Sequence, residues 1–410
     1  MKFGSFYELE IPRPWEPGKE QRIFREGLEQ VELADRLGFD SVWATEHHFL
    51  EEYAHSSAPE VFLAACSQRT KRIRLGHGVT LLPLAYNHPA RVAERIATLD
   101  LVSEGRVEFG TGESSSEVEL GGFGIGRQDK REMWQESLEA ICRMFTEEPF
   151  MGHQGKYFEM PPRNVVPKPV QKPHPPLWVA CSKAETIQLA ARNGIGALSF
   201  AFVPLNQIGP WVDGYYKTLE EESLPIGAAI NPNIVFTIQF MCLKNGDRAR
   251  EIANEAHRFF SYAISHYYVF GEHQPGKTNL WHNFKTDKEH IGQQVWGGST
   301  QVVGEGVKPT DCVGTPKEVR EVLLQYEQLG ADQVVFITQT ANTPNEVLCE
   351  ALELFGREVM PEFQEREARR EKEKAARLER ILEKAMKRKA APKIPRRDGP
   401  TIVKAAGGLL

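Results

Sequence analysis

The feature that most constrains this fold is a repeated alternation of short apolar runs with amphipathic helical segments. Roughly eight such pairs lie between Lys2 and Met360, a pattern typical of parallel strands joined by helices. We therefore predict an α/β fold, and a TIM (β/α)8 barrel in preference to a doubly wound sheet. No GxGxxG motif follows a predicted strand and opens a helix, so the fingerprint of a dinucleotide-binding Rossmann site is absent.

A candidate catalytic segment follows the second predicted strand. An apolar run from Phe39 to Ala44 comes after the helix-ending Gly38 and leads into Glu46, His47 and His48. Chemistry in α/β barrels gathers beyond the carboxyl ends of the strands, and neutral imidazole exchanges protons near pH 7. The same residues are equally compatible with a surface histidine pair, or with a core histidine whose polar partner is Glu46.

Two other segments are candidates for ligand contact. The predicted strand 73–82 contains Gly76 and Gly78, and glycine inside a strand marks either a close approach of a ligand or a bulge. Residues 271–306 are polar and rich in glycine, and a loop of this length in a compact domain is either a mobile lid or a disordered insertion.

The C-terminal region differs from the rest of the chain in charge. From Arg366 onward there are 15 Lys/Arg and 6 Asp/Glu, a net charge of about +9, whereas the preceding part carries about −15. We expect a solvated helix over 366–389 and a flexible end over 392–410, although a basic tail can also bind an anionic surface. We therefore divide the chain into a barrel, residues 1–362, and a charged extension, residues 363–410.

The composition of the chain indicates a cytoplasmic protein without a membrane span. No run of about 18 apolar residues is present, so no membrane span is expected. Six cysteines are scattered without a CxxC pair, which favours reduced thiols in a cytoplasmic protein over a disulfide framework or a metal site. We expect neither a nucleic acid nor a membrane as a partner.

Several motifs, in one order over residues 1 to about 362, resemble the α subunit of bacterial luciferase. They comprise the N-terminus, the histidine block, two short segments after later strands and the closing turns: Met1–Gly4, Gly38–Phe49, Leu82–Arg91, Ser103–Gly110, Val313–Pro316 and Val359–Pro361. The resemblance implies a luciferase-like TIM barrel in which 271–306 is a mobile lid. It further implies that FMN, reduced by a separate flavin reductase, reacts with O2 to a C4a-peroxyflavin that oxidises a small organic substrate.

The resemblance also assigns roles to the histidines. His47 matches the first histidine of the family block and is expected to act as acid/base beside the flavin, with Glu46 or a backbone carbonyl fixing its tautomer. His88 matches a second histidine of the family site. His48 is expected to be structural.

The flavin contacts carry over with two departures. Gly78 and Val79 match the small pair under the flavin ring, and backbone N–H groups around Cys181, Ser182 and Lys183, just before a helix, suit a phosphate. Glu113 stands where luciferase has an arginine directed at the phosphate, so the positive charge must come from elsewhere, and Lys183 or Arg131 can supply it. Gly112 replaces a luciferase cysteine and is expected to open room on that face of the flavin.

Two rival functions remain compatible with the sequence. One is F420-dependent hydride transfer, which occurs in the same superfamily, and the other is a non-catalytic flavin-binding subunit of a heterodimer. In the luciferase β subunit asparagine occupies the His47 position, so His47 argues against the second rival. Family barrels pair through helices on one flank, so we expect a homodimer, with a heterodimer as the alternative. The sequence names neither the substrate nor the reaction subtype.

Overall fold

The structure, a computed structural model, describes residues 1–410 except 201–203, 288–291, 297–298, 305, 392–393 and 396–410. Within the described residues, eight parallel strands close into a barrel, and β10 pairs with β9 to complete the circle. In spatial order they are β1 (Lys2–Tyr7), β2 (Ser41–Ala44), β3 (Arg74–His77), β5 (Val107–Gly112), β8 (Leu177–Cys181), β9 (Gly196–Ser199), β10 (Ile234–Cys242) and β14 (Gln333–Ile337). The predicted TIM barrel is confirmed.

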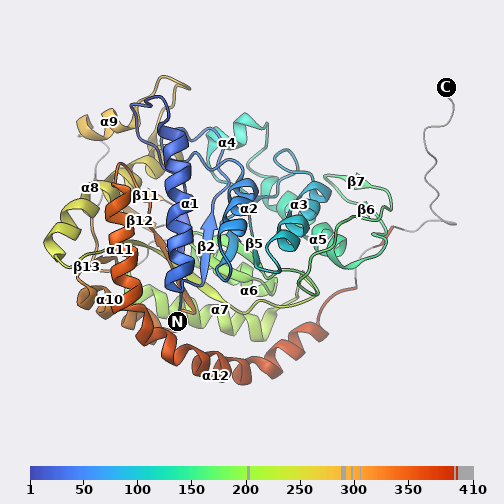
Figure 1. The fold of residues 1–410 in the computed structure, drawn as a ribbon. Coiled ribbons are helices and arrows are strands. Elements are labelled where there is room, and N and C mark those ends of the chain that lie inside the picture. Colours follow the sequence, from blue (N-terminus) through green and yellow to red (C-terminus); the bar gives the residue numbers. More distant parts are fainter. Residues whose placement is uncertain (201–203, 288–291, 297–298, 305, 392–393, 396–410) are drawn as a thin grey trace.

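Helices surround the barrel and connect its strands (Figure 1). They are α1 (Lys19–Leu37), α2 (Pro59–Arg69), α3 (Pro89–Val102), α5 (Lys130–Thr146), α6 (Ala184–Arg192), α7 (Leu205–Glu222), α8 (Gly246–Ser265), α10 (Pro316–Gln328) and α11 (Asn345–Glu358). Local sequence sets their ends. Gly38 stops α1 with a left-handed φ of 97°, and its N–H bonds the carbonyl oxygens of Ala34 and Asp35.

Two aromatic side chains fill the inside of the barrel. Trp43 and Trp178 meet edge to face, with ring centroids 5.5 Å apart. A Cβ on Gly76 would lie 2.3 Å from the ring of Trp43. Gly76 therefore makes room for a core tryptophan, whereas Gly78 lies two residues later, where the chain reaches the mouth of the barrel.

The predicted lid segment, residues 271–306, contains regular structure in its described part. It follows a π-helical turn, η1 (His266–Phe270), and includes α9 (Leu280–Thr286) and the antiparallel pair β11 (Gly292–Trp296) and β12 (Ser299–Val303). The rest of the expected lid, residues 288–291, 297–298 and 305, lies outside the described residues.

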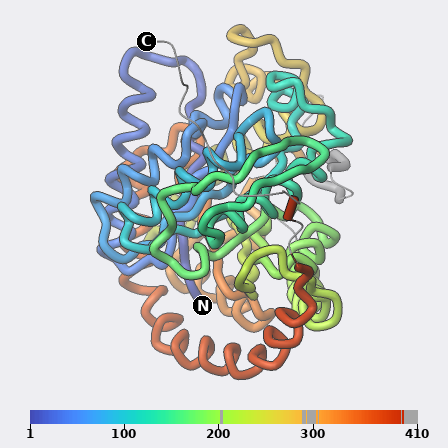
Figure 2. Tube along the Cα trace, turned by 90° about the vertical axis from the view of Figure 1, so that its right-hand side faces the viewer, coloured from blue at the N-terminus to red at the C-terminus, as the bar shows by residue number. Residues whose placement is uncertain are grey.

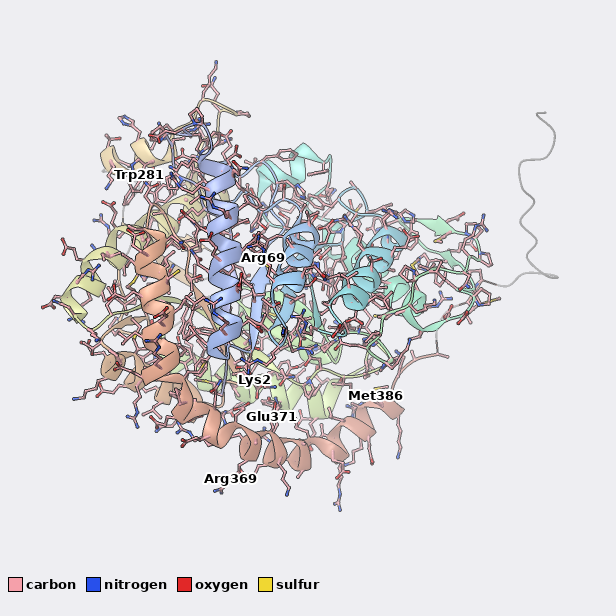
Figure 3. All side chains as sticks on the ribbon, in the orientation of Figure 1. Lys2, Arg69, Trp281, Arg369, Glu371 and Met386 are labelled. Atoms are coloured by element: carbon pink, nitrogen blue, oxygen red, sulfur yellow. The ribbon has the colours of Figure 1, made fainter. Side chains whose placement is uncertain are left out.

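Helix α12 (Met360–Lys387) crosses the N-terminal end of the barrel as a long curved rod (Figures 1 and 2). Figure 3 places Lys2, at the start of β1, beside Glu371 of α12, while Trp281 of α9 lies at the opposite end of the molecule. Glu327 accepts hydrogen bonds from Arg366 and Arg370, and Lys374 pairs with Asp332 at 2.7 Å. The helix therefore begins before the expected boundary at residue 363 and covers its own barrel.

Most of the expected flexible end, residues 392–410, lies outside the described residues. In the part of the chain that is described, the helices are all too short or too polar to cross a bilayer.

Candidate active site

A cavity of about 660 Å³ opens at the C-terminal ends of the barrel strands. Residues at or just after the ends of β1, β2, β3, β5, β8, β9 and β14 line it, as expected for a barrel active site. Nine of the ten predicted site residues lie on its wall: Glu46, His47, Gly78, Val79, Gly112, Glu113, Cys181, Ser182 and Lys183.

His88 is the predicted site residue that does not line the cavity. Its side chain is exposed and caps α3, with Nδ1 accepting a hydrogen bond from the N–H of Ala90 at 3.2 Å. The Asn-His-Pro turn before α3 needs such a cap because the first N–H groups of a helix lack partners within the helix. This local requirement accounts for the histidine.

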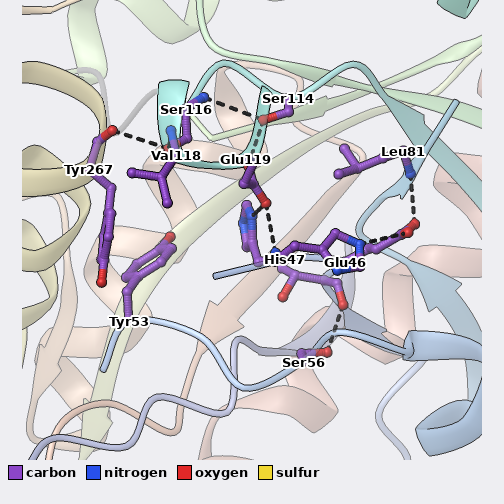
Figure 4. A network of polar contacts seen from close by, with 12 residues as sticks. Glu46, His47, Tyr53, Ser56, Leu81, Ser114, Ser116, Val118, Glu119 and Tyr267 are labelled. Carbon is purple, nitrogen blue, oxygen red and sulfur yellow. Dashed lines mark hydrogen bonds and ion pairs between the residues drawn. The ribbon is translucent and has the colours of Figure 1, made fainter. Parts of the chain in front are cut away.

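His47 lies between two buried carboxylates, Glu119 and Glu8. Figure 4 shows the contact with Glu119. Its Nδ1 is 3.0 Å from Oε1 of Glu119, and its Nε2 is 3.6 Å from Oε2 of Glu8. Burial alone would lower the pKa of His47, but Glu119 and Glu8 outweigh burial and raise this pKa to about 9. The expected neutral imidazole is therefore corrected: at pH 7 His47 is an imidazolium, which starts as a proton donor.

Glu46 does not hold the His47 ring, contrary to expectation. Its carboxylate accepts hydrogen bonds from the N–H of Leu81 and from Nδ2 of Asn87, both at 2.8 Å, and lies 3.1 Å from Nε2 of His48. Neighbouring side chains in extended backbone point in opposite directions, so Glu46 points away from His47. Glu46 instead holds His48 and the loop after β3. Glu119 takes the orienting role instead.

Glu119 comes from a short helix, α4 (Glu117–Gly122), and contacts His47 without itself lining the cavity. Burial would raise the pKa of this carboxyl, but His47, Ser114 and the N–H of His48 all bond it and hold its pKa below the usual range. Glu119 is therefore a carboxylate at neutral pH and the main partner of the imidazolium.

Glu8 directly follows β1 and forms the other side of this cluster. Its Oε2 accepts a hydrogen bond from Oγ1 of Thr45 at 2.7 Å, and its Oε1 accepts one from the hydroxyl of Tyr53 at 3.0 Å. Burial raises the pKa of Glu8, and His47 opposes the rise. The sequence offered a signal for this residue, since a carboxylate directly after a predicted strand occupies the same position as Glu46.

The floor of the cavity is formed by Gly78 and Val79, which are joined by a cis peptide bond. A Cβ on Gly78 would lie 2.9 Å from the ring of Phe6, so a larger residue does not fit without displacement. The room expected at Gly112 is not open, because a Cβ there would meet Cγ2 of Val79 at 2.4 Å. Val79 fills that space.

Positive charge gathers at the outer end of the cavity. Glu113 is bound bidentately by Arg131, at 2.6 to 3.0 Å, and lies 3.4 Å from Nζ of Lys130. Lys183 is the N-cap of α6, and its N–H donates to Oγ1 of Thr186 at 3.3 Å, so this amide has a partner within the helix cap. The Cys181 side chain is fully buried, with Sγ donating to the carbonyls of Val179 and Thr186, so only its backbone borders the site.

The inner half of the cavity is apolar and aromatic. Its wall contains side chains from the ends of three strands and from α8 and η1: Phe6, Phe200, Phe260, Ile264, Tyr268 and Ile337. Phe6 and Phe200 meet edge to face at 5.0 Å. The π-helical turn η1 is a backbone form that recurs at functional sites.

The lid segment is anchored to the loop that carries His47. Glu52, which is buried, accepts hydrogen bonds from the N–H groups of Leu280 and Trp281 at the start of α9. Glu51 accepts from the N–H of Gly276 at 2.7 Å and from Arg13 at 2.7 Å. These carboxylates, together with Glu8 and Glu119, are functional candidates that the sequence reasoning missed.

One relative that matches over nearly its whole length is an oxygenase component. The chain is 26% identical over 379 residues to the oxygenase component of the flavin-dependent trigonelline monooxygenase of Acinetobacter baylyi, covering 89% of this chain and 96% of that protein. Two uncharacterized proteins of Sinorhizobium fredii are 33% and 36% identical, but these matches span 48% and 54% of those proteins, about half of their length.

Solved structures share the fold. Monooxygenase RslO1 of Streptomyces bottropensis superposes with a TM-score of 0.70 at 25% identity, covering 88% of this chain and 100% of that one. The oxygenating constituent of 3,6-diketocamphane monooxygenase of Pseudomonas putida, in complex with FMN, gives 0.66 at 19% identity with 88% and 98% covered. An F420-dependent secondary alcohol dehydrogenase gives 0.64 at 18% with 87% and 98% covered, so the barrel alone does not separate the two cofactors.

The match to a family profile covers most of the barrel. Residues 1–333 match the profile described as luciferase-like monooxygenase. This stretch contains every cavity residue described above except Ile337. The chain belongs to the luciferase-like monooxygenase family.

Proposed function

We propose that this chain is the oxygenase component of a two-component, FMN-dependent monooxygenase that oxidises a small organic substrate with O2. One observation carries the proposal: a single cavity joins a cationic outer end to an imidazolium held between carboxylates. The trigonelline enzyme, named as an oxygenase component, supports a separate flavin reductase as partner. We propose a homodimer, with a heterodimer as the alternative.

The residues of the cavity fit FMN. A volume of about 660 Å³ lies in the range of ordinary cofactor sites. Lys130 and Arg131 would face the phosphate, supplying the charge that Glu113 lacks, and the start of α6 adds the positive end of a helix dipole. Gly78 and Val79 would lie against the ring. When bound, reduced FMN supplies the electrons that activate O2.

In this proposal His47 acts first as an acid. Its Nε2 lies 3.6 Å from Oε2 of Glu8, a residue of the cavity wall, while Glu119 holds Nδ1. A positioned proton donor typically contributes 10²–10⁴-fold to a rate. Glu119 orients the ring and stabilises the imidazolium, and Glu46 holds the adjacent loop.

The lid segment would keep water out of the site. Its helix α9 is fixed at the N-terminus by Glu52, five residues after His47. Exclusion of water favours oxygen transfer to a substrate over wasteful release of H2O2.

Binding and oxidation of reduced FMN test the proposal. Reduced FMN should bind anaerobically at one per chain, and O2 should then consume bound reduced FMN more slowly than free reduced FMN, with H2O2 release slowed to match. His47→Gln should bind reduced FMN and release H2O2 at an altered rate. Stoichiometric binding of F420 without FMN binding would support F420-dependent hydride transfer instead, and unchanged kinetics in His47→Gln would point to the non-catalytic subunit.

A further inference from the structure

Glu8 presents a buried carboxyl group to the cavity. Only 4% of the residue is exposed, and the neighbouring wall is made of Phe6, Phe260, Ile264 and Tyr268. Two hydroxyl groups bond its oxygens, while a carboxylate offers about four acceptor positions. Glu8 therefore keeps hydrogen-bonding capacity on the side that faces the cavity.

Negative charge is in excess at this inner end. Glu8, Glu46 and Glu119 surround one imidazolium, and Glu119 already pairs with it at 3.0 Å. Glu46 is used by Leu81, Asn87 and His48. Glu8 lies on the cavity wall, and its contact with His47 is longer and weaker than that of Glu119. It is therefore the carboxyl group of this cluster that is best placed to contact a ligand.

The outer end of the same cavity has the opposite sign. Arg127, Lys130, Arg131 and Lys183 line this end with one lining carboxylate, Glu113, while Arg127 also pairs with Glu117, which does not line the cavity. An anionic ligand group is favoured there and opposed near Glu8, because charges separated by apolar walls are weakly screened. The two ends of the cavity therefore favour ligand groups of opposite charge.

We propose that Glu8 is a specificity-determining residue that contacts the substrate, and that the substrate is a flat, largely apolar molecule bearing a cationic nitrogen or a hydrogen-bond donor. The aromatic wall suits a flat ring and stabilises a cation over its faces. A carboxylate substrate would be repelled by Glu8, and the imidazolium of His47 beside it is already paired with Glu119 and Glu8, so desolvating that substrate there is costly. This inference rests on the proposed function, which assigns the outer end to the cofactor.

Three ring compounds of equal size, differing in charge, test this inference: N-methylquinolinium, 1-methylnaphthalene and 1-naphthoate. Their dissociation constants are measured by calorimetry on the full chain with bound FMN. N-methylquinolinium should bind at least about tenfold more tightly than 1-naphthoate, because Glu8 attracts its fixed positive charge and repels the carboxylate. In Glu8→Gln this ratio should fall by about tenfold, with 1-methylnaphthalene affinity changed less than about twofold.

Two variants control the measurement. Glu221→Gln removes an exposed carboxylate on α7 and should leave the ratio unchanged. Tyr53→Phe removes a donor to Glu8 but keeps its charge, so the cation preference should persist. Thermal melts establish that Glu8→Gln is folded, and if it is not, the wild-type ratio alone decides.

Equal or reversed wild-type affinities, or an unchanged ratio in folded Glu8→Gln, would overturn the inference. Normal FMN binding with no cation preference rejects the role of Glu8 and leaves the proposed function standing. Failure of FMN binding rejects the proposed function, while the ranking of the three compounds on the protein without FMN still decides whether Glu8 selects cations.

Discussion

The two ends of the barrel each hold a cavity lined with charged residues, yet they differ in how the charges are matched. At the N-terminal end, a cavity of about 780 Å³ lies between the strand starts and α12. There Lys2 pairs with Glu371, Arg74 with Glu108 and Lys374 with Asp332. At the C-terminal end, buried carboxylates outnumber the single imidazolium that they share. Cavity volume therefore does not identify the site, whereas unmatched buried charge does.

The paired charges beneath the barrel have a structural explanation. Lys2 and Glu371 have side chains that are 42% and 52% exposed, so their mutual attraction is screened by water. Such pairs orient α12 over the strand starts and leave no unpaired charge among their members that would favour binding of a ligand. At the other end, Glu8 and Glu119 have almost no exposure, so each carboxylate needs a hydrogen-bonding or ion-pair partner within the protein or its ligand.

Turnover gives the largest expected difference between the two ends. His47→Gln should lower product formation by about 10²–10⁴-fold because the positioned acid is lost. Lys374→Met, which breaks a partly buried ion pair below the barrel, should change it by less than about twofold. Product formation is measured with saturating reduced FMN and a substrate of the cationic class. Equal losses in both variants would erase the functional contrast between the ends.

The second-largest expected difference between the two ends of the barrel is in how their residues make stability depend on pH. The pKa of His47 is raised to about 9 in the folded chain, from 6.5. Its stabilising contribution is therefore complete below pH 6.5 and is lost as pH rises through about 9, an effect of roughly 3 kcal/mol. Glu119→Gln should remove most of this pH dependence, since it removes the strongest partner.

Chemical unfolding at pH 6.5 and pH 9.5 measures that loss in the wild type and in Glu119→Gln. Histidine NMR titration follows the pKa of His47 directly and should show it lower in the variant. An NMR pKa near 6.5 in the wild type would remove the imidazolium from the site. Glu221→Gln provides the matched surface control, with wild-type pH dependence expected.

Glu327→Gln should give a smaller effect confined to the N-terminal end. Glu327 is 12% exposed and pairs with Arg366, Arg370 and the N-terminal amino group of Met1, so its loss should lower the free energy of unfolding by about 1–2 kcal/mol. Affinity for reduced FMN should be unchanged. A matching loss of FMN binding would mean that the two ends are coupled through the barrel.

Asp40→Asn should have the smallest effect, with the opposite sign. Burial raises the pKa of Asp40 to about 6, although the N–H of Phe3 and Lys2 oppose the rise. A raised carboxyl pKa means that the ionised form is disfavoured by folding, so stability is gained as pH falls through 6 and is lowest above it. The amide should therefore stabilise the chain at pH 8 by about 1 kcal/mol and by roughly half as much at pH 5. Thermal melts at both pH values provide the comparison.

The sequence predicts features that depend on residues close together in the chain, and it does not predict contacts between residues that are far apart in it. The strand–helix alternation is local, and strand ends converge in a barrel, so nine of the residues predicted from position and resemblance line one cavity. The partner of His47 was not found because Glu119 is 72 residues away and reaches it only through the closed fold. His88 lies away from the cavity because the turn before α3 uses it as a helix cap, a local requirement that is independent of function. The course of α12 depends on scattered ion pairs that composition does not locate.

The anchoring of α9 has a consequence for timing. Displacing α9 withdraws two N–H donors from Glu52, a buried carboxylate on the same short loop as His47. If α9 opens as part of the proposed lid, the open state would therefore carry an electrostatic cost that the closed state does not, and this cost would arise five residues from His47. Under the proposed function, entry of a substrate and departure of a product would then be linked to the loop that carries His47, and release could limit the rate even when the chemistry is fast.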